Sequence, residues 1–188
     1  ICSSSTAMKA GKSYDTSMGM TPLEGIVMGT RSGDIDAGIP KFLADNNNMS
    51  FADIDNALNK KSGLLGLSGI SSDMRDIESA AKDGHERAKL AVDVLRHRAL
   101  KYIGAYAIEL GRVDAIIFTG GIGENGIDFR ASVVERLTAL GIRLDAAANN
   151  ARGKEVVISA ADSPIKVMVV PTNEELVIAR DTRDIVRK

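Results

Sequence analysis

The amino-acid sequence predicts an α/β fold in which helices flank a mixed sheet. Two observations support this class. The run Val113–Thr119 is apolar and rich in β-branched residues, like a buried strand, and it follows a stretch over 85–110 in which apolar residues recur at helical spacing. Elsewhere in the second half, strand-like runs alternate with helical ones, as in proteins whose sheet is covered by helices. The 188 residues correspond to one ordinary domain.

The first half of the chain is expected to be rich in loops. Residues 1–18 suit a strand or hairpin, and residues 19–40 form a long loop of a kind that usually carries a function. Ser50 is placed to cap a helix that ends near Lys60. Three apolar residues recur on one face of this helix: Phe51, Ile54 and Leu58. A loop rich in glycine, serine and leucine is expected over 62–72.

The second half is expected to alternate helices and strands. After the long helix and the strand described above, Gly120–Gly126 is predicted to be a tight loop and Ile127–Leu140 a helix. Further strands are expected at three places: 141–144, 156–158 and 166–170. A closing helix is expected to begin at Thr172.

The composition is that of a globular protein and excludes several functional classes. Hydrophobic residues make up 44% of the chain, which is enough for a buried core. The formal net charge is −1, with no basic cluster, so a nucleic-acid partner is not expected. No apolar stretch reaches the roughly 18 residues of a membrane span. Cys2 is the sole cysteine, which excludes an internal disulfide and suits a cytoplasmic protein.

The strongest local motif is the glycine-rich segment Thr119–Asn125 between the predicted strand and helix. Glycines let a backbone approach a phosphate or nucleoside closely, and the N–H groups at a helix start favour anions. A plain strand-to-helix turn would need fewer glycines. The segment therefore favours nucleotide binding.

A rival interpretation of the same segment is dinucleotide binding. Gly121, Gly123 and Gly126 satisfy the G-x-G-x-x-G pattern, and Asp145 lies at about the distance expected of a ribose-binding acid. This pattern alone is weak evidence, and a dinucleotide fold usually carries it in its first βαβ unit. A nicotinamide-dependent oxidoreductase nevertheless remains an alternative class.

The long loop contains Arg31 among small residues. The planar fork of an arginine can hold two oxygens of a phosphoryl group in transit, and small neighbours let the backbone fold tightly around it. A plainer alternative pairs Arg31 with Asp34 or Asp36 across a turn. The spacing of these residues does not decide between the two.

Two segments have the pattern of a helix start. In 71–76, Asp73 is placed as an N-cap. In 171–175, Thr172 is placed to cap the closing helix and Glu175 to reach back in a capping box. This leaves Glu174 to project toward a ligand, where a carboxylate would suit Mg²⁺.

Several segments together resemble the acetate kinase family in residue type, order and spacing. These segments are Asp15–Gly25, Gly29–Asp34, Phe118–Asn125 and Pro171–Glu175. The resemblance covers essentially the whole chain. It implies an RNase-H-like domain of the actin, hexokinase and Hsp70 ATPase superfamily.

The resemblance also implies roles for individual residues. Arg31 matches the arginine that stabilises the transferring phosphoryl group, Glu174 the glutamate associated with Mg²⁺, and Pro22 a proline near the pocket for the methyl group of the acid. Contact with ATP or ADP is implied for eight residues: Asp73, Met74, Arg75, Gly121, Ile122, Gly123, Glu124 and Asn125.

By this resemblance, the chain is expected to be the C-terminal nucleotide-binding domain, residues 1–188, of an enzyme that reversibly phosphorylates acetate with ATP and Mg²⁺. The family places an N-terminal domain and a His-Leu-Gly-Asn-Gly phosphate loop before these segments. We therefore expect the chain to need that half for turnover and to form a homodimer. Propionate or butyrate kinase is a close alternative, and a catalytically inert dimerising module is a distant one.

Overall fold

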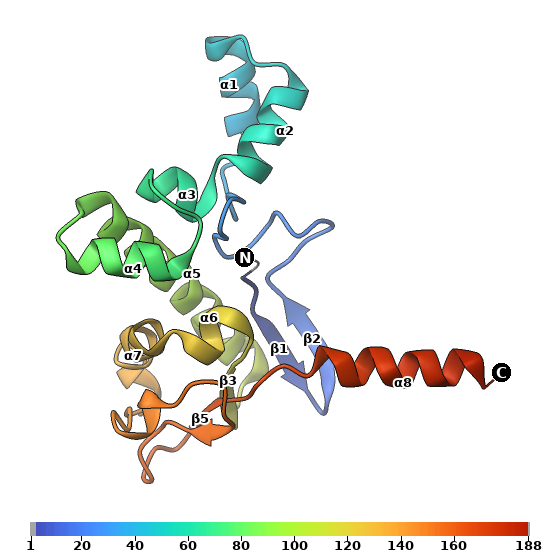
Figure 1. The fold of residues 1–188 in the computed structure, drawn as a ribbon, viewed down its shortest axis with the longest axis vertical. Helices are drawn as coiled ribbons and strands as arrows, with labels where there is room; N and C mark the ends of the chain where they lie inside the picture. The colour runs from blue at the N-terminus through green and yellow to red at the C-terminus, as the bar shows by residue number, and fades with distance from the viewer. Residues whose placement is uncertain (1–2, 188) are drawn as a thin grey trace. The chain divides into compact units, whose positions relative to one another are not determined.

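Figure 1 shows the computed structural model of the protein, which describes residues 3–187. The chain divides into two compact units, one up to Val113 and the other from Asp114 onward. Each unit has its own buried apolar residues. Leu64, Ile77 and Leu95 belong to the first, and Val133 and Val167 belong to the second.

Unit 1 begins with the expected hairpin. Strands β1 (Thr6–Lys9) and β2 (Lys12–Thr16) pair antiparallel. Between them, Ala10 and Gly11 have φ angles of 51° and 74°. Positive φ at both central residues suits the right-handed twist of the flanking strands in a two-residue hairpin turn.

Helices α1 (Ile39–Asn47) and α2 (Phe51–Lys60) follow the long loop. The predicted cap at Ser50 is confirmed. Its hydroxyl accepts from the N–H of Asp53, and the carboxylate of Asp53 accepts from the N–H of Ser50. The expected apolar face is only partly buried: Ile54 is 3% exposed but Phe51 is 82% exposed. Helix α2 packs mainly on α1, which has no buried residue, so the first turn of α2 is left uncovered.

The loop expected over 62–72 is wrong in part, since it contains helix α3 (Gly63–Ser68). This helix packs against α5, and its Leu64 is fully buried. Burial of that side chain offsets the low helix propensity of the glycines, a tertiary effect that local composition does not report.

Helices α4 (Met74–Lys82) and α5 (Glu86–Leu110) complete unit 1 and pack on each other. The predicted long helix is confirmed. His85 caps it, because its Nδ1 accepts from the N–H of Ala88 at 3.1 Å. The residues of α5 that are buried are Ala88, Ala91, Leu95 and Tyr106.

Unit 2 contains the mixed sheet that the sequence predicts. Strands β3 (Ala115–Phe118), β5 (Lys166–Val169) and β4 (Val156–Val157) lie in this order, with β3 parallel and β4 antiparallel to β5. β3 is an edge strand and is less buried than predicted, because its Ile117 is 56% exposed.

The helices of unit 2 differ from the predicted ones in their bounds. The segment expected to be a loop forms the short helix α6 (Gly120–Asn125). The helix expected to reach Leu140 ends earlier, as α7 (Ile127–Val134). After it, the N–H groups of Arg136 and Leu137 donate to the third preceding residue and not the fourth, so the chain is wound more tightly. Leu137 is buried there. Two 3-10 turns follow: η1 (Thr138–Leu140) and η2 (Ala148–Asn150). In place of the strand expected at 141–144 there is an isolated bridge from Leu144 to Ser159.

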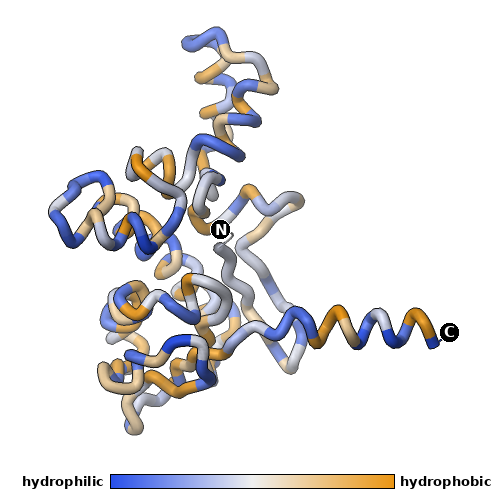
Figure 2. The backbone as a smooth tube through the Cα atoms, viewed as in Figure 1, coloured by the Kyte–Doolittle hydropathy of each residue, from blue (hydrophilic) through white to orange (hydrophobic). Residues whose placement is uncertain are grey.

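The closing helix α8 (Glu174–Val186) has no buried residue. Apolar and polar residues alternate along it, as Figure 2 shows, and Ile178 and Ile185 are 64% and 72% exposed. Within residues 3–187, no helix is long and apolar enough to cross a membrane.

Two neighbouring tyrosines on α5 suggest a pH dependence of the stability. The rings of Tyr102 and Tyr106 are 5.8 Å apart, and the hydroxyl of Tyr102 donates to Asp34 at 2.9 Å. Burial raises the pKa of both phenols, for Tyr106 to about 12, and the charge of Asp34 acts in the same direction.

We expect the free energy of unfolding to fall as the pH rises above about 10, because the unfolded chain loses these protons first. Urea unfolding of the wild type and of the double variant Tyr102→Phe/Tyr106→Phe, at several pH values between about 8 and 11, measures this. In the double variant, the free energy of unfolding should fall much less over this pH range than in the wild type. Tyr14→Phe, at a 51% exposed tyrosine, serves as control and should show the same fall as the wild type. An equal decline in all three proteins would contradict the assignment.

Candidate functional site

The long loop of unit 1 has no helix or strand between residues 17 and 38, yet its centre is tightly folded. The N–H of Asp34 donates to the carbonyl of Gly25 at 2.9 Å, and the carbonyl of Arg31 accepts from the N–H of Met28 at 3.1 Å. Three consecutive side chains in it are at most 5% exposed: Ile26, Val27 and Met28. The centre of the loop is therefore buried and hydrogen-bonded, and Arg31 follows it directly in the chain.

Arg31 lies next to Pro22, the other residue of this loop that the family resemblance singled out. Its Nη1 is 3.4 Å from the carbonyl oxygen of Pro22 and 3.9 Å from the sulfur of Met28. Arg31 as a residue is half-buried. The fold thus brings the candidate phosphoryl-binding residue beside the candidate acid-binding residue.

The two acids considered as alternative partners of Arg31 bind other groups. The carboxylate of Asp34 accepts from the N–H of Gly25 at 2.8 Å and from the hydroxyl of Tyr102 at 2.9 Å, and it pairs with Arg98 at 3.4 Å. Asp36 accepts from the N–H of Gly38. Asp34 thereby connects the loop to α5, a structural role that the spacing did not predict.

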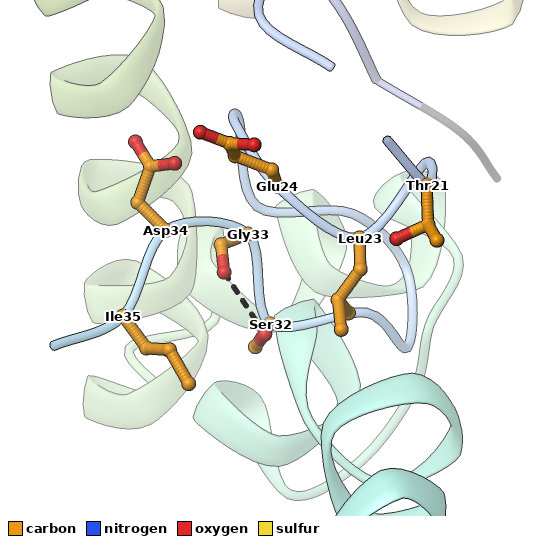
Figure 3. Close-up of a pocket in the computed structure, with 7 residues that line it drawn as sticks. All are labelled: Thr21, Leu23, Glu24, Ser32, Gly33, Asp34 and Ile35. Carbon is orange, nitrogen blue, oxygen red and sulfur yellow. Dashed lines mark hydrogen bonds between the residues drawn. The ribbon is translucent and has the colours of Figure 1, made fainter. Parts of the chain in front are cut away.

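A pocket of about 270 Å³ opens on the same loop (Figure 3). Its lining residues are Thr21, Leu23, Glu24, Ser32, Gly33, Asp34 and Ile35. Thr21 and Leu23 flank Pro22 in the chain, and Ser32 follows Arg31. The lining includes the acidic residues Glu24 and Asp34 and the apolar residues Leu23 and Ile35.

Asp73 caps helix α4, as the local pattern predicted. Its carboxylate accepts from the N–H of Arg75 at 2.9 Å and from the guanidinium of the same residue at 2.6 Å and 3.0 Å. These bonds from the Arg75 side chain and backbone lower the pKa of Asp73 to about 2. Met74, between them, is 5% exposed, so its side chain belongs to the core and leaves its backbone for any ligand contact.

In unit 2, the glycines of α6 fall into two kinds. A Cβ atom on Gly121 would meet nothing within 4 Å, whereas one on Gly123 would lie 3.0 Å from the backbone of Phe118. Gly123 therefore allows α6 to pack closely on β3. Gly121 is exposed and leaves the outer side of α6 open.

The side chain of Glu124 binds backbone groups of α6 and of the segment that precedes α8. Its Oε1 accepts from the N–H groups of Gly120 and Thr172, both at 2.9 Å. The hydroxyls of Thr119 and Thr172 are also hydrogen-bonded, at 2.8 Å. The carboxylate thus connects α6 to the segment that leads into α8. Sequence reasoning missed this role, because the partners are far apart in the chain.

The cap of α8 is Asn173 and not Thr172, which corrects the sequence-based prediction. The Oδ1 of Asn173 accepts from the N–H of Leu176 at 3.1 Å, while Thr172 is held by Glu124 as described. Because the cap moves by one residue, Glu175 no longer occupies the third helical position that a capping box requires. Glu174 begins the helix and is exposed.

The acid required by the dinucleotide alternative has a structural role. Asp145 accepts from the N–H groups of Ala147 and Ala148, both at 3.0 Å, at the start of η2. Such a local capping arrangement explains the residue without a ribose.

A sequence profile described as the acetokinase family matches residues 2–180. The chain belongs to the acetokinase family. The acetate kinase of Halothermothrix orenii is 61% identical to it over 180 residues, which are 96% of this chain and 45% of that protein. The chain therefore spans about half the length of the curated relatives it matches.

Solved structures of this family share the fold. A crystal structure of acetate kinase from Porphyromonas gingivalis matches 97% of this chain and 46% of its own, with a TM-score of 0.92 and 50% identity. A propionate kinase from Francisella tularensis matches 94% of this chain and 45% of its own, with a TM-score of 0.88 and 46% identity. These similarities confirm the predicted α/β fold with a mixed sheet and flanking helices.

The two glycines of α6 should respond differently to substitution. We expect Gly123→Ala to lower the free energy of unfolding by about 1 kcal/mol or more, because the added methyl group would crowd the backbone of Phe118. Gly121→Ala should cause no loss, since its methyl group meets open space and alanine favours a helix. Urea unfolding of both variants tests this, and equal losses would contradict the packing role of Gly123.

Proposed function

We propose that this chain is the nucleotide-binding half of an enzyme that transfers the γ-phosphoryl group of ATP to acetate. In the reaction, a carboxylate oxygen of acetate forms a bond to the γ-phosphorus, and the bond from that phosphorus to the β–γ bridging oxygen breaks. The products are acetyl phosphate and ADP, and the reaction is reversible. The observation that carries the proposal is the position of Arg31 beside Pro22 on a loop whose centre is buried, in a chain so similar to acetate kinases.

Arg31 would act on the transferring phosphoryl group. Phosphoryl transfer places charge on three equatorial oxygens, so catalysis consists mainly of positioning and electrostatic stabilisation. A guanidinium contacts two oxygens at once, and a rigid loop keeps it in place without reorganisation. Pro22 would then border the methyl group of the acid.

Two groups of residues are proposed to contact the nucleotide. Asp73, Met74 and Arg75 at the start of α4 supply one group, and α6 supplies the residues Gly121, Ile122, Gly123, Glu124 and Asn125. The exposed outer side of α6 at Gly121 leaves room for a ligand close to the backbone. Glu124 would contribute mainly by keeping α6 in shape.

Glu174 would contribute to magnesium binding. No group of three or more metal-binding side chains occurs among the described residues 3–187. Mg²⁺ is usually held by one or two carboxylates together with substrate phosphates and water, so a single exposed carboxylate fits this cation. The ion, when bound, would neutralise phosphate charge.

Acetate is the proposed acid because the most similar curated relatives that we compared are acetate kinases. Propionate is the second candidate, since a propionate kinase shares the fold at 46% identity. We further propose that the parent enzyme, in which this chain is joined to an N-terminal half, is a cytoplasmic homodimer.

We expect the parent enzyme to bind ADP more tightly than NAD in calorimetric titrations. Gly121→Val should raise the Kd for ADP at least about tenfold, because the side chain enters the open side of α6. Gly104→Val, at an exposed glycine of α5 that also faces open space, is the matched control and should leave the Kd for ADP unchanged. Tighter binding of NAD than of ADP would contradict the proposed kinase function.

Arg31→Ala in the parent enzyme should lower kcat by roughly 10³-fold, or about 4 kcal/mol of transition-state stabilisation. Arg31→Lys should recover little of this, because an ammonium group offers one point contact in place of a fork. The affinity for ATP should change little, since the interaction strengthens mainly in the transition state. Steady-state kinetics with thermal melts test this. A nearly normal kcat in Arg31→Ala, with a lower melting temperature, would reduce Arg31 to a structural residue.

A further inference from the structure

Unit 2 contains a fully buried arginine that the proposed reaction does not use. The side chain of Arg130, on α7, is 0% exposed. All five N–H donors of its guanidinium are hydrogen-bonded at distances of 2.7–2.9 Å. The five acceptors are neutral: the carbonyl oxygens of Gly123, Glu124, Asn149 and Ala151, and the side-chain oxygen of Asn149.

These acceptors belong to the ends of two short helical segments. Gly123 and Glu124 lie in the last turn of α6, and Asn149 and Ala151 lie at the end of η2. The last carbonyl groups of a helix have no partner within it and carry partial negative charge. Arg130 thus caps two C-termini at once and fixes the backbone of α6 from the side that faces the interior.

The burial of this charge is unfavourable in itself. Removing a guanidinium from water costs free energy, and a buried charge is therefore weak evidence for a role in stability. An apolar side chain of similar volume would fill the space but leave five oxygens without these donors. The arrangement is best explained by a requirement for a defined backbone geometry at Gly123 and Glu124.

We infer that Arg130 is a positioning residue for nucleotide binding. It holds the carbonyls of Gly123 and Glu124 so that α6 has its binding geometry before the ligand arrives. Through the carboxylate of Glu124, the same constraint extends to Thr172 and the start of α8. This inference rests on the proposed function of α6 as a nucleotide-binding segment.

The test compares Arg130→Lys with Asn149→Ala in the parent enzyme. Lysine keeps the charge but cannot reach both helix ends with a planar fork. Asn149→Ala removes an acceptor of Arg130 and a bond to the carbonyl of Ile127, but it leaves the bonds to α6. Both variants should have a lower melting temperature.

We expect Arg130→Lys to raise the Kd for ADP at least about tenfold at a temperature where both variants are folded, with the KM for acetate changed less than threefold. Asn149→Ala should keep the Kd for ADP within about threefold of the wild type. Equal Kd values for the two variants would overturn the positioning role.

A measurement on the unmutated protein is decisive even if Arg130→Lys does not fold. The amides of Gly120 and Gly126, which donate to Glu124 and to the carbonyl of Ile122, should be protected from hydrogen exchange without ADP, because α6 is already fixed. Rapid exchange that stops when ADP binds would overturn the inference. Binding of ADP by the wild type, weakened by Gly121→Val, would show in the same series that the proposed function survives even if the role of Arg130 fails.

Discussion

Charged side chains that hydrogen-bond to backbone groups hold the candidate functional segments of each unit in shape. Asp34 binds the N–H of Gly25 and connects the loop to α5, Glu124 binds the N–H of Thr172, and Arg130 binds carbonyls at two helix ends. Irregular backbone leaves polar groups without partners in a helix or sheet, and these groups must be satisfied when they are buried. A charged partner makes a stronger bond than a neutral one and sets the shape of the segment.

This construction suits phosphoryl transfer, in which positioning and electrostatics supply most of the catalysis. Arg31 follows three nearly inaccessible residues of its loop, Ile26, Val27 and Met28. In the proposed reaction, this buried stretch would lower the cost of ordering the guanidinium. In α6, the buried Gly123 permits close packing on β3, while the exposed Gly121 keeps the other side open. The short helix α6 is therefore packed on its Gly123 side and open on its Gly121 side.

Sequence reasoning succeeded where the signal lay within a few residues. The cap at Ser50, the N-cap at Asp73 and the long helix over 85–110 are present as predicted. It failed where tertiary contacts outweighed local composition. Leu64 turns a glycine-rich stretch into helix by packing on α5. The hydroxyl of Thr172 is bonded to that of Thr119, and the cap of α8 lies at the next residue, Asn173.

The sequence by itself determined the α/β class, the starts of α2, α4, α5 and α7, and the identity of the motifs that place the chain in its family. Periodicity and capping depend on neighbours along the chain, so they can be read without a structure. Only the tertiary structure decided which carboxylates hold backbone and which remain exposed, and it alone revealed Arg130. Tyr102 and Asp34 are 68 positions apart, and Thr172 and Glu124 are 48 apart. Such partners are chosen by the packing of distant elements, which local spacing does not encode.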